Sequence, residues 1–281
     1  MEFLQLVWLA DLNVSAASGL VYHRDALHVI ADDSLQLHRY TLQGEQMNEI
    51  SLLSGTLPDD ASERKRNKPD FEALVLLPDN ALLALGSGST ENRMKGSLVT
   101  PNGARTIDLI SLHQALKNEF QELNLEGATV LGEHLVLAQR GNGCGGENAL
   151  ILLGLAQVQQ ELLSGILSAQ SIEQIIPVSL GQLMNVNLAF TDLCVDSQGR
   201  LCFSAAAEAT ENTYVDGPCK GSIIGTLDQH FQVNWSTALA PAAKIEGITF
   251  VPDGRLLLVA DPDCATTKGP LFALNIPRII E

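Results

Sequence analysis

The stretch Glu246–Asp261, EGITFVPDGRLLLVAD, decides the fold, because its pattern recurs four more times along this 281-residue chain. A polar residue heads the stretch, an alternating apolar segment follows, and a turn at Asp253-Gly254 leads into a leucine-rich segment. The other copies are SGLVYHRDALHVIADD from Ser18, EALVLLPDNALLALGS from Glu72, EGATVLGEHLVLAQR from Glu126 and TDLCVDSQGRLCFSAA from Thr191. Self-similarity at a regular spacing is the signature of a repeat architecture.

Each copy predicts a β-hairpin. The second strand starts at a leucine nine or ten residues after the head: Leu27, Leu82, Leu135, Leu201 and Leu256. The other turns are Arg24-Asp25, Asp79-Asn80, Gly132-Glu133 and Gln198-Gly199, which carry residues that favour hairpin loops. The second strand is often apolar on both faces, as a strand buried between layers requires.

The spacing of the heads gives the number of repeats. Successive heads are 54, 54, 65 and 55 residues apart, and the path from Glu246 through both chain ends to Ser18 is 53 residues. Five nearly equal intervals use the whole chain, which predicts a single all-β domain over 1–281, a five-bladed β-propeller. Residues 1–12 are expected to supply the outer strand of the last blade and so close the ring.

Two segments depart from the strand pattern. Residues 110–123 place apolar side chains at Ile110, Leu112, Leu116 and Phe120 and predict a short amphipathic helix. Residues 155–185 fill the longest interval and predict outer strands with a further helical insertion.

Composition narrows the class of protein. A net charge of −16 and a pI near 4.7 argue against binding to nucleic acid or to an anionic membrane. The chain has no apolar run long enough to span a membrane, and its N-terminus lacks the features of a signal peptide. Five cysteines without a tight pair do not form a disulfide framework. We therefore expect a cytoplasmic monomer.

The heads of the repeats are the candidate metal ligands. In a propeller the innermost strands run along the central channel, so Ser18, Glu72, Glu126, Thr191 and Glu246 would form one ring around the axis. Three converging carboxylates repel one another unless they are protonated or bridged by a cation. An oxygen-only set suits Ca²⁺. The alternative is that the glutamates accept hydrogen bonds from neighbouring blades and only fix blade packing.

Cations and carboxylates in the loops on the same face are candidates for binding and catalysis. The predicted anion-binding residues are Arg93, Lys95, Arg140, Lys220 and Lys268, which would hold a small anionic molecule. The predicted catalytic residues are Asp32, Asp33, Arg140 and Asp261, with an aspartate positioning a water or acting as a general base. The alternative is that the loop lysines are solvated and the aspartates cap turns.

The cysteines and histidines give weaker signals. Cys144, Cys219 and Cys264 occupy corresponding loops of three blades, but their spacing matches no zinc pattern, and Cys194 and Cys202 are expected in the core. The sequence contains no GxSxG motif, and its six histidines form no recognisable Ser-His-Asp set.

Ser, Glu, Glu, Thr and Glu at the heads of five repeats resemble the calcium-activated nucleotidases, or apyrases. The segment ASGLVYHRDALHVIADDS is similar to that family's first hairpin, and Gln139-Arg140 lies where the family has an arginine pair. The resemblance implies a five-bladed propeller with a central calcium and nucleotide hydrolysis. Here, however, Asp32-Asp33 is followed by Ser-Leu instead of the family's Arg-Thr-Gly. The EG-apolar-PDGR pattern is also similar to bacterial phytase-like and esterase-like propellers.

Three functions stay open at this point. The first is a calcium-dependent hydrolase of phosphate esters or anhydrides. The second is a non-catalytic propeller with a structural calcium that binds a small anion or a protein. The third, a lactonase or esterase type of calcium propeller, is disfavoured because no histidine dyad is evident near the ring.

Overall fold

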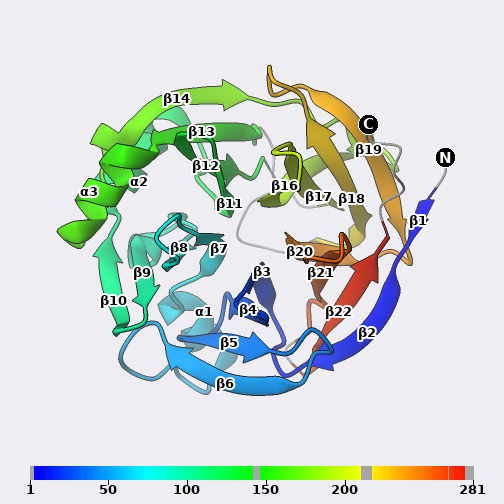
Figure 1. Ribbon diagram of the computed structural model, residues 1–281, viewed down its shortest axis with the longest axis horizontal. Coiled ribbons are helices and arrows are strands. Elements are labelled where there is room, and N and C mark those ends of the chain that lie inside the picture. Colours follow the sequence, from blue (N-terminus) through cyan, green and yellow to red (C-terminus); the bar gives the residue numbers. More distant parts are fainter. Residues whose placement is uncertain (1–2, 142–145, 210–216, 265, 276–281) are drawn as a thin grey trace.

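The computed structural model describes residues 3–141, 146–209, 217–264 and 266–275. It is a five-bladed β-propeller, with the blades arranged in chain order around a central channel (Figure 1). The inner strands of neighbouring blades contact one another in sequence, and the last contacts the first. The predicted fold is confirmed.

Each blade is an antiparallel sheet whose first strand lies innermost. Blade one contains β3 (Ala17–His23), β4 (Ala26–Ala31), β5 (Gln36–Tyr40) and β6 (Gln46–Ser51). Blade two contains β7 (Phe71–Leu76), β8 (Leu82–Gly86), β9 (Lys95–Thr100) and β10 (Gly103–Asp108). Blade three contains β11 (Leu125–Leu131), β12 (His134–Gln139), β13 (Ala149–Gly154) and β14 (Ile172–Pro177). Blade four contains β16 (Val186–Val195), β17 (Leu201–Glu208), β18 (Cys219–Leu227) and β19 (Val233–Ala240), preceded by the short β15 (Gln182–Leu183). Blade five contains β20 (Lys244–Phe250), β21 (Leu256–Asp261) and β22 (Gly269–Leu274).

The N-terminal segment closes the ring, but over fewer residues than expected. Strand β2 (Val7–Leu12) pairs antiparallel with β22 and completes blade five, as the wrap-around spacing predicts. The prediction that all of 1–12 forms this strand is wrong, because β1 (Phe3–Gln5) instead pairs parallel with β19 of blade four. Leu6, between the two strands, is buried in the apolar cluster shared by these blades. The segment thus joins blade four to blade five.

The apolar repeat pattern builds the core between blades. The described residues form five buried apolar clusters, one at each interface between neighbouring blades. The leucines that start the second strands, Leu27, Leu82, Leu135, Leu201 and Leu256, are all at most 3% exposed. Burial of each such side chain contributes about 2 kcal/mol. The turns also follow the sequence: Arg24 and Asp25 both have positive φ angles, 49° and 56°, as a two-residue hairpin turn requires.

The helices lie in the connections between strands. Helix α2 (Ile110–Glu119) occupies the region predicted from the sequence and buries Leu112 and Leu116. Helix α3 (Leu155–Leu163) and a 3₁₀ turn (Ala169–Ser171) precede β14 in the long third interval, as predicted. Helix α1 (Ala61–Asn67) was not predicted, and a second 3₁₀ turn covers Glu91–Arg93. In the described part of the chain, no helix has the length and apolar character needed to cross a membrane.

Candidate functional site

The five ring residues share one local distortion. In every blade the pairing of the first two strands skips the head of the repeat: Ser18, Glu72, Glu126, Thr191 and Glu246. A β-bulge of this kind bends the strand and re-aims the side chain of the unpaired residue. The repeat pattern thus marks five structurally equivalent positions.

The two hydroxyl members of the ring bond to protein groups. Ser18 Oγ donates to the carbonyl oxygen of Phe71 on the neighbouring blade at 2.5 Å. Thr191 Oγ1 lies 2.8 Å from Ser204 Oγ and is fully buried away from the central cavity. These two hydroxyl residues therefore fix the packing of the strands and blades, which is the role that the sequence analysis considered for the glutamates.

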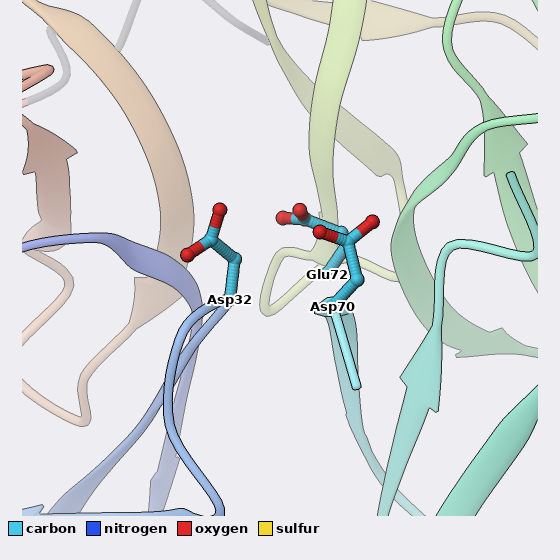
Figure 2. Close-up of side chains that lie close together, drawn as sticks. All are labelled: Asp32, Asp70 and Glu72. Carbon is cyan, nitrogen blue, oxygen red and sulfur yellow. The ribbon is translucent and has the colours of Figure 1, made fainter. Parts of the chain in front are cut away.

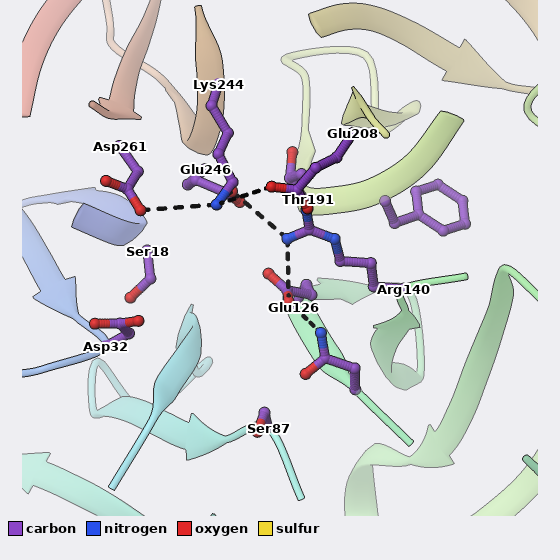
Figure 3. Close-up of polar contacts among 12 residues, drawn as sticks. Ser18, Asp32, Ser87, Glu126, Arg140, Thr191, Glu208, Lys244, Glu246 and Asp261 are labelled. Carbon is purple, nitrogen blue, oxygen red and sulfur yellow. Dashed lines mark hydrogen bonds and ion pairs between the residues drawn. The ribbon is translucent and has the colours of Figure 1, made fainter. Parts of the chain in front are cut away.

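Two ring glutamates face a cation that the protein itself supplies. Arg140, 4% exposed, places Nη1 3.2 Å from Glu126 Oε1 and 3.5 Å from Glu246 Oε1 (Figure 3). Its Nη2 atom donates to Glu208 Oε2 at 2.9 Å. A guanidinium carries its charge at every accessible pH and fits several carboxylates at once. The repulsion between these ring carboxylates is thus relieved by Arg140.

Lys244 extends this network to blade five. Its Nζ atom lies 3.2 Å from Glu246 Oε1, 3.0 Å from Asp263 Oδ1 and 3.7 Å from Asp261 Oδ2. The pKa of Lys244 is raised because the surrounding carboxylates outweigh the opposing effect of burial. Glu246 is 4% exposed, and neither of its oxygens has a hydrogen-bond partner among the described residues. Its charge is met by ion pairs with Lys244 at 3.2 Å and Arg140 at 3.5 Å.

A second cluster joins blades one and two. One carboxylate oxygen each from Asp32, Asp70 and Glu72 lies within 4.8 Å of the others (Figure 2). Lys68 Nζ contacts Asp32 Oδ2 and lies 2.9 Å from Asp70 Oδ1, and Arg93 Nη1 lies 2.7 Å from Asp70 Oδ2. The acidic cluster thus contains one lysine and lies beside one arginine.

Burial raises the pKa of several carboxyl groups around the channel. It raises the pKa of Asp32 to about 6, of Asp261 to about 7 and of Glu126 to about 8, despite the lowering effect of nearby cations. Burial and the charges of neighbouring carboxylates raise the pKa of Glu72 well above its usual value. Groups with pKa values near neutrality can exchange protons during catalysis.

These four carboxyl groups line a cavity of about 70 Å³ at the centre of the ring. Of the residues predicted from the sequence, the lining contains Ser18, Asp32, Glu72, Arg93, Glu126, Arg140, Glu246 and Asp261. Asp33, Lys95, Lys220 and Lys268 do not line it. Asp33 pairs with Arg64 at 3.7 Å, and the three lysines are exposed at the surface. The structure therefore brings together the arginines and most of the carboxylates, but not the loop lysines.

Sequence reasoning missed Lys65, Lys68, Asp70 and Lys244, which also line the cavity. A signal for some of them exists: Asp70, Asn124 and Lys244 each stand two residues before a ring glutamate. Asn124 Nδ2 donates to Glu126 Oε1 at 2.6 Å. Lys65 and Lys68 come from helix α1 and its end, which no repeat pattern predicts.

The cysteines split as follows. Cys194 and Cys202 are buried in the core, as predicted. Cys219 is half-buried and Cys264 is exposed, and neither lines the cavity. Cys144 lies outside the described residues.

Comparison with known proteins identifies the family and the fold. The chain matches a family of unknown function (DUF6929) over residues 13–276 and therefore belongs to it. No curated protein matches the sequence. The solved structure of Myxococcus xanthus glutaminyl cyclase is similar, with 14% identity over 98% of this chain and 98% of its own, and a TM-score of 0.53.

Two further solved structures show more distant likeness. A gluconolactonase from Xanthomonas campestris has 12% identity over 90% of this chain and 69% of its own, with a TM-score of 0.46. Virginiamycin B lyase from Staphylococcus aureus has 14% identity over 93% and 67%, with a TM-score of 0.39. At these identities the likeness concerns the fold alone, and the resemblance to nucleotidases stays a prediction.

Proposed function

We propose that this member of the family binds a divalent cation, with calcium as the best chemical match, beside a small phosphate-bearing anion, and hydrolyses that anion. The observation that carries the proposal is the convergence of Asp32, Asp70 and Glu72 on a cavity that is also lined by Arg93 and Arg140. Carboxylates next to arginines can hold a metal and the anion that it attracts.

The proposed metal ligands are Asp32, Asp70 and Glu72. Ca²⁺ takes oxygen ligands at about 2.3–2.6 Å, so ligands on opposite sides of the ion are about 5 Å apart. The mutual distances within 4.8 Å fit this requirement, and the donors are all hard oxygens. The ammonium of Lys68 now neutralises two of them. The proposal moves the expected calcium from the axis, where Arg140 lies, to the side formed by blades one and two.

The anion would bind to the cationic lining. Arg93 and Arg140 are buried and held by carboxylates, so their orientation is fixed before a ligand arrives. Lys65 lines the same cavity. The enclosed volume admits a metal ion with a small anionic group, so the remainder of a larger substrate would lie outside the cavity.

Asp261 is the group that we assign to proton transfer. It lines the cavity, and its pKa of about 7 allows it to accept a proton from an attacking water and to release it again near neutral pH. A bound calcium would supply positive charge that orients and polarises the phosphate. Arg140 and Arg93 would stabilise the negative charge on its oxygens.

A second candidate is a non-catalytic propeller that binds calcium or a small anion. The observation in its favour is that Lys68, Arg140 and Lys244 already neutralise much of the carboxylate charge. In that case calcium raises the melting temperature without any turnover.

Release of phosphate from nucleotides, sugar phosphates and phytate, measured with calcium or with EDTA, tests the proposal. We expect calcium-dependent release that Asp261→Asn lowers by about 100-fold or more. Asp253→Asn, in an exposed turn of the same blade, should leave the rate unchanged. Turnover that EDTA does not affect would contradict the metal role, and stabilisation by calcium without turnover would favour the second candidate.

A further inference from the structure

A serine, a histidine and a glutamate form a hydrogen-bonded chain in blade one, away from the central cavity. Ser34 Oγ lies 3.1 Å from His38 Nε2, and His38 Nδ1 lies 3.0 Å from Glu49 Oε1. Ser34 stands in the turn after β4, His38 is on β5, and Glu49 is its cross-strand partner on β6. Gln46 Nε2 donates to the same glutamate oxygen at 2.9 Å. The order nucleophile, base and orienting carboxylate is that of a hydrolytic triad.

The contacts select the tautomer that catalysis requires. Since Glu49 accepts from Nδ1, that nitrogen carries the hydrogen, and Nε2 is left to accept the proton of the Ser34 hydroxyl. His38 is 7% exposed, and burial lowers its pKa despite the opposing effect of Glu49. The imidazole is therefore neutral at pH 7 and available as a base.

The hydroxyl of Ser34 has a structural contact as well, but this contact does not account for the histidine. Ser34 Oγ accepts a hydrogen bond from the backbone N–H of Gln36 at 3.1 Å. That bond fixes the turn through an oxygen lone pair and leaves the hydroxyl proton to be donated to His38. A turn serine needs neither a buried histidine nor a glutamate behind it.

The serine and the histidine face a groove between blades five and one. Its volume is about 400 Å³, and it shares no lining residue with the central cavity. Arg64, Asp33 and Lys268 also line it, and Arg64 pairs with Asp33 at 3.7 Å. Lys268 is exposed, so the groove offers a positive charge to an incoming substrate.

We infer that Ser34, His38 and Glu49 form a second hydrolytic site, which cleaves small carboxylic esters that carry an anionic group. Ser34 Oγ would attack the ester carbonyl carbon while its proton passes to His38 Nε2. The bond from that carbon to the alcohol oxygen breaks, and the alcohol leaves with the proton from His38. Water then adds to the acyl-serine, with His38 again moving the proton, and releases the carboxylic acid. Each turnover consumes one ester and one water.

Covalent labelling of the full chain tests this site independently of any metal. A fluorophosphonate, which reacts with activated serines, should attach once per chain at Ser34, as located by peptide mass spectrometry. Ser34→Ala should abolish the label, and His38→Asn should slow labelling by about 100-fold. Ser51→Ala, which changes an exposed serine of the same blade outside the groove, should label at the normal rate. The melting temperature of each variant shows whether it is folded.

Glu49→Gln provides a second test, because Glu49 is partly exposed and its loss leaves no buried charge. It should label at a reduced rate, while the protein keeps its fold. Absence of any adduct on Ser34 in the folded wild type would overturn the inference, and so would an adduct that forms equally fast in His38→Asn.

The preference for anionic esters is tested with p-nitrophenyl acetate and p-nitrophenyl hemisuccinate in the presence of EDTA. We expect the hemisuccinate to be cleaved faster, and Lys268→Ala to lower the hemisuccinate rate more than the acetate rate. Equal effects on both esters would contradict the assigned substrate class. Because EDTA is present, the outcome does not depend on the calcium-dependent function proposed above.

Discussion

The two sides of the central cavity balance their carboxylates in different ways. On the side of blades three to five, the guanidinium of Arg140 lies between Glu126, Glu208 and Glu246, and Lys244 adds a second charge. On the side of blades one and two, the Lys68 ammonium contacts two of three convergent carboxylates, and Arg93 pairs with one of these, Asp70. A guanidinium bonded in several directions is a fixed part of the fold, whereas an ammonium is a point charge on a flexible stem. The comparison teaches that equivalent ring positions can have different counter-charges, which is why we place the proposed metal beside Glu72 and not beside Glu126.

Removal of Arg140 should give the largest effect. Arg140→Met leaves three buried carboxylates without their shared cation, and the free energy of unfolding in EDTA should fall by about 3–5 kcal/mol. Arg140→Lys keeps the positive charge but loses the planar guanidinium group, so it should lower the free energy of unfolding by a smaller amount. Urea denaturation measures both, and a loss below about 1 kcal/mol for Arg140→Met would show that this side is not held by the arginine.

The next effect is expected in the pH dependence of stability, and it comes from Glu126. Its pKa is raised from 4.5 to about 8, so between these values the folded state holds a proton that the unfolded state has lost. The free energy of unfolding therefore decreases as pH rises through this window, with a slope from this group of up to about 1.4 kcal/mol per pH unit.

Glu126→Gln mimics the protonated form and should remove this decrease, so that the variant is more stable than the wild type above pH 8. The exposed Glu133→Gln in the same blade is the matched control and should keep the wild-type slope. An unchanged slope in Glu126→Gln, measured by denaturation at a series of pH values, would contradict the buried proton.

Lys68→Met removes a cation from the side of the cavity formed by blades one and two. In EDTA we expect a loss of about 2 kcal/mol, because the acidic cluster loses its ammonium while Asp70 keeps Arg93. Calcium should restore this loss and should bind more tightly than to the wild type, since the competing charge is gone. Thermal unfolding with and without calcium measures both effects. If calcium stabilises Lys68→Met no more than the wild type, the ammonium and the metal do not share a site.

The smallest effect is expected at Ser18. Ser18→Ala removes one buried hydrogen bond to Phe71 of the next blade and should cost about 1 kcal/mol. Because Ser18 is assigned to packing, calcium affinity should stay unchanged, which isothermal titration calorimetry measures. A clear loss of calcium affinity would show that the Ser18 hydroxyl is a metal ligand.

The fold could be predicted from the sequence because its cause is local and repeated. Each copy carries its own turn residues, its own leucine at the start of the second strand and its own head, so five copies fix the number of blades. The split of the N-terminal segment between two blades could not be predicted, because the pairing of Phe3–Gln5 with β19 depends on where two sheet edges lie in space.

The site could be predicted only in part, because charge balance is a property of three dimensions. The repeat register identifies Glu72 and Glu126 as equivalent positions. It does not show that Arg140 pairs with Glu126, whereas Lys68 pairs with Asp70 beside Glu72. Likewise, Ser34, His38 and Glu49 match no motif, since strand pairing brings Glu49 opposite His38.

Calcium binding to Glu72→Gln and to Glu126→Gln tests the central claim most directly. The two residues head neighbouring repeats and occupy the same bulge position, so the substitutions are matched in chemistry and in structure. With calcium followed by isothermal titration calorimetry, we predict that Glu72→Gln loses binding and that Glu126→Gln keeps the affinity of the wild type. Loss of binding in Glu126→Gln with retention in Glu72→Gln would place the metal on the axis and contradict the account.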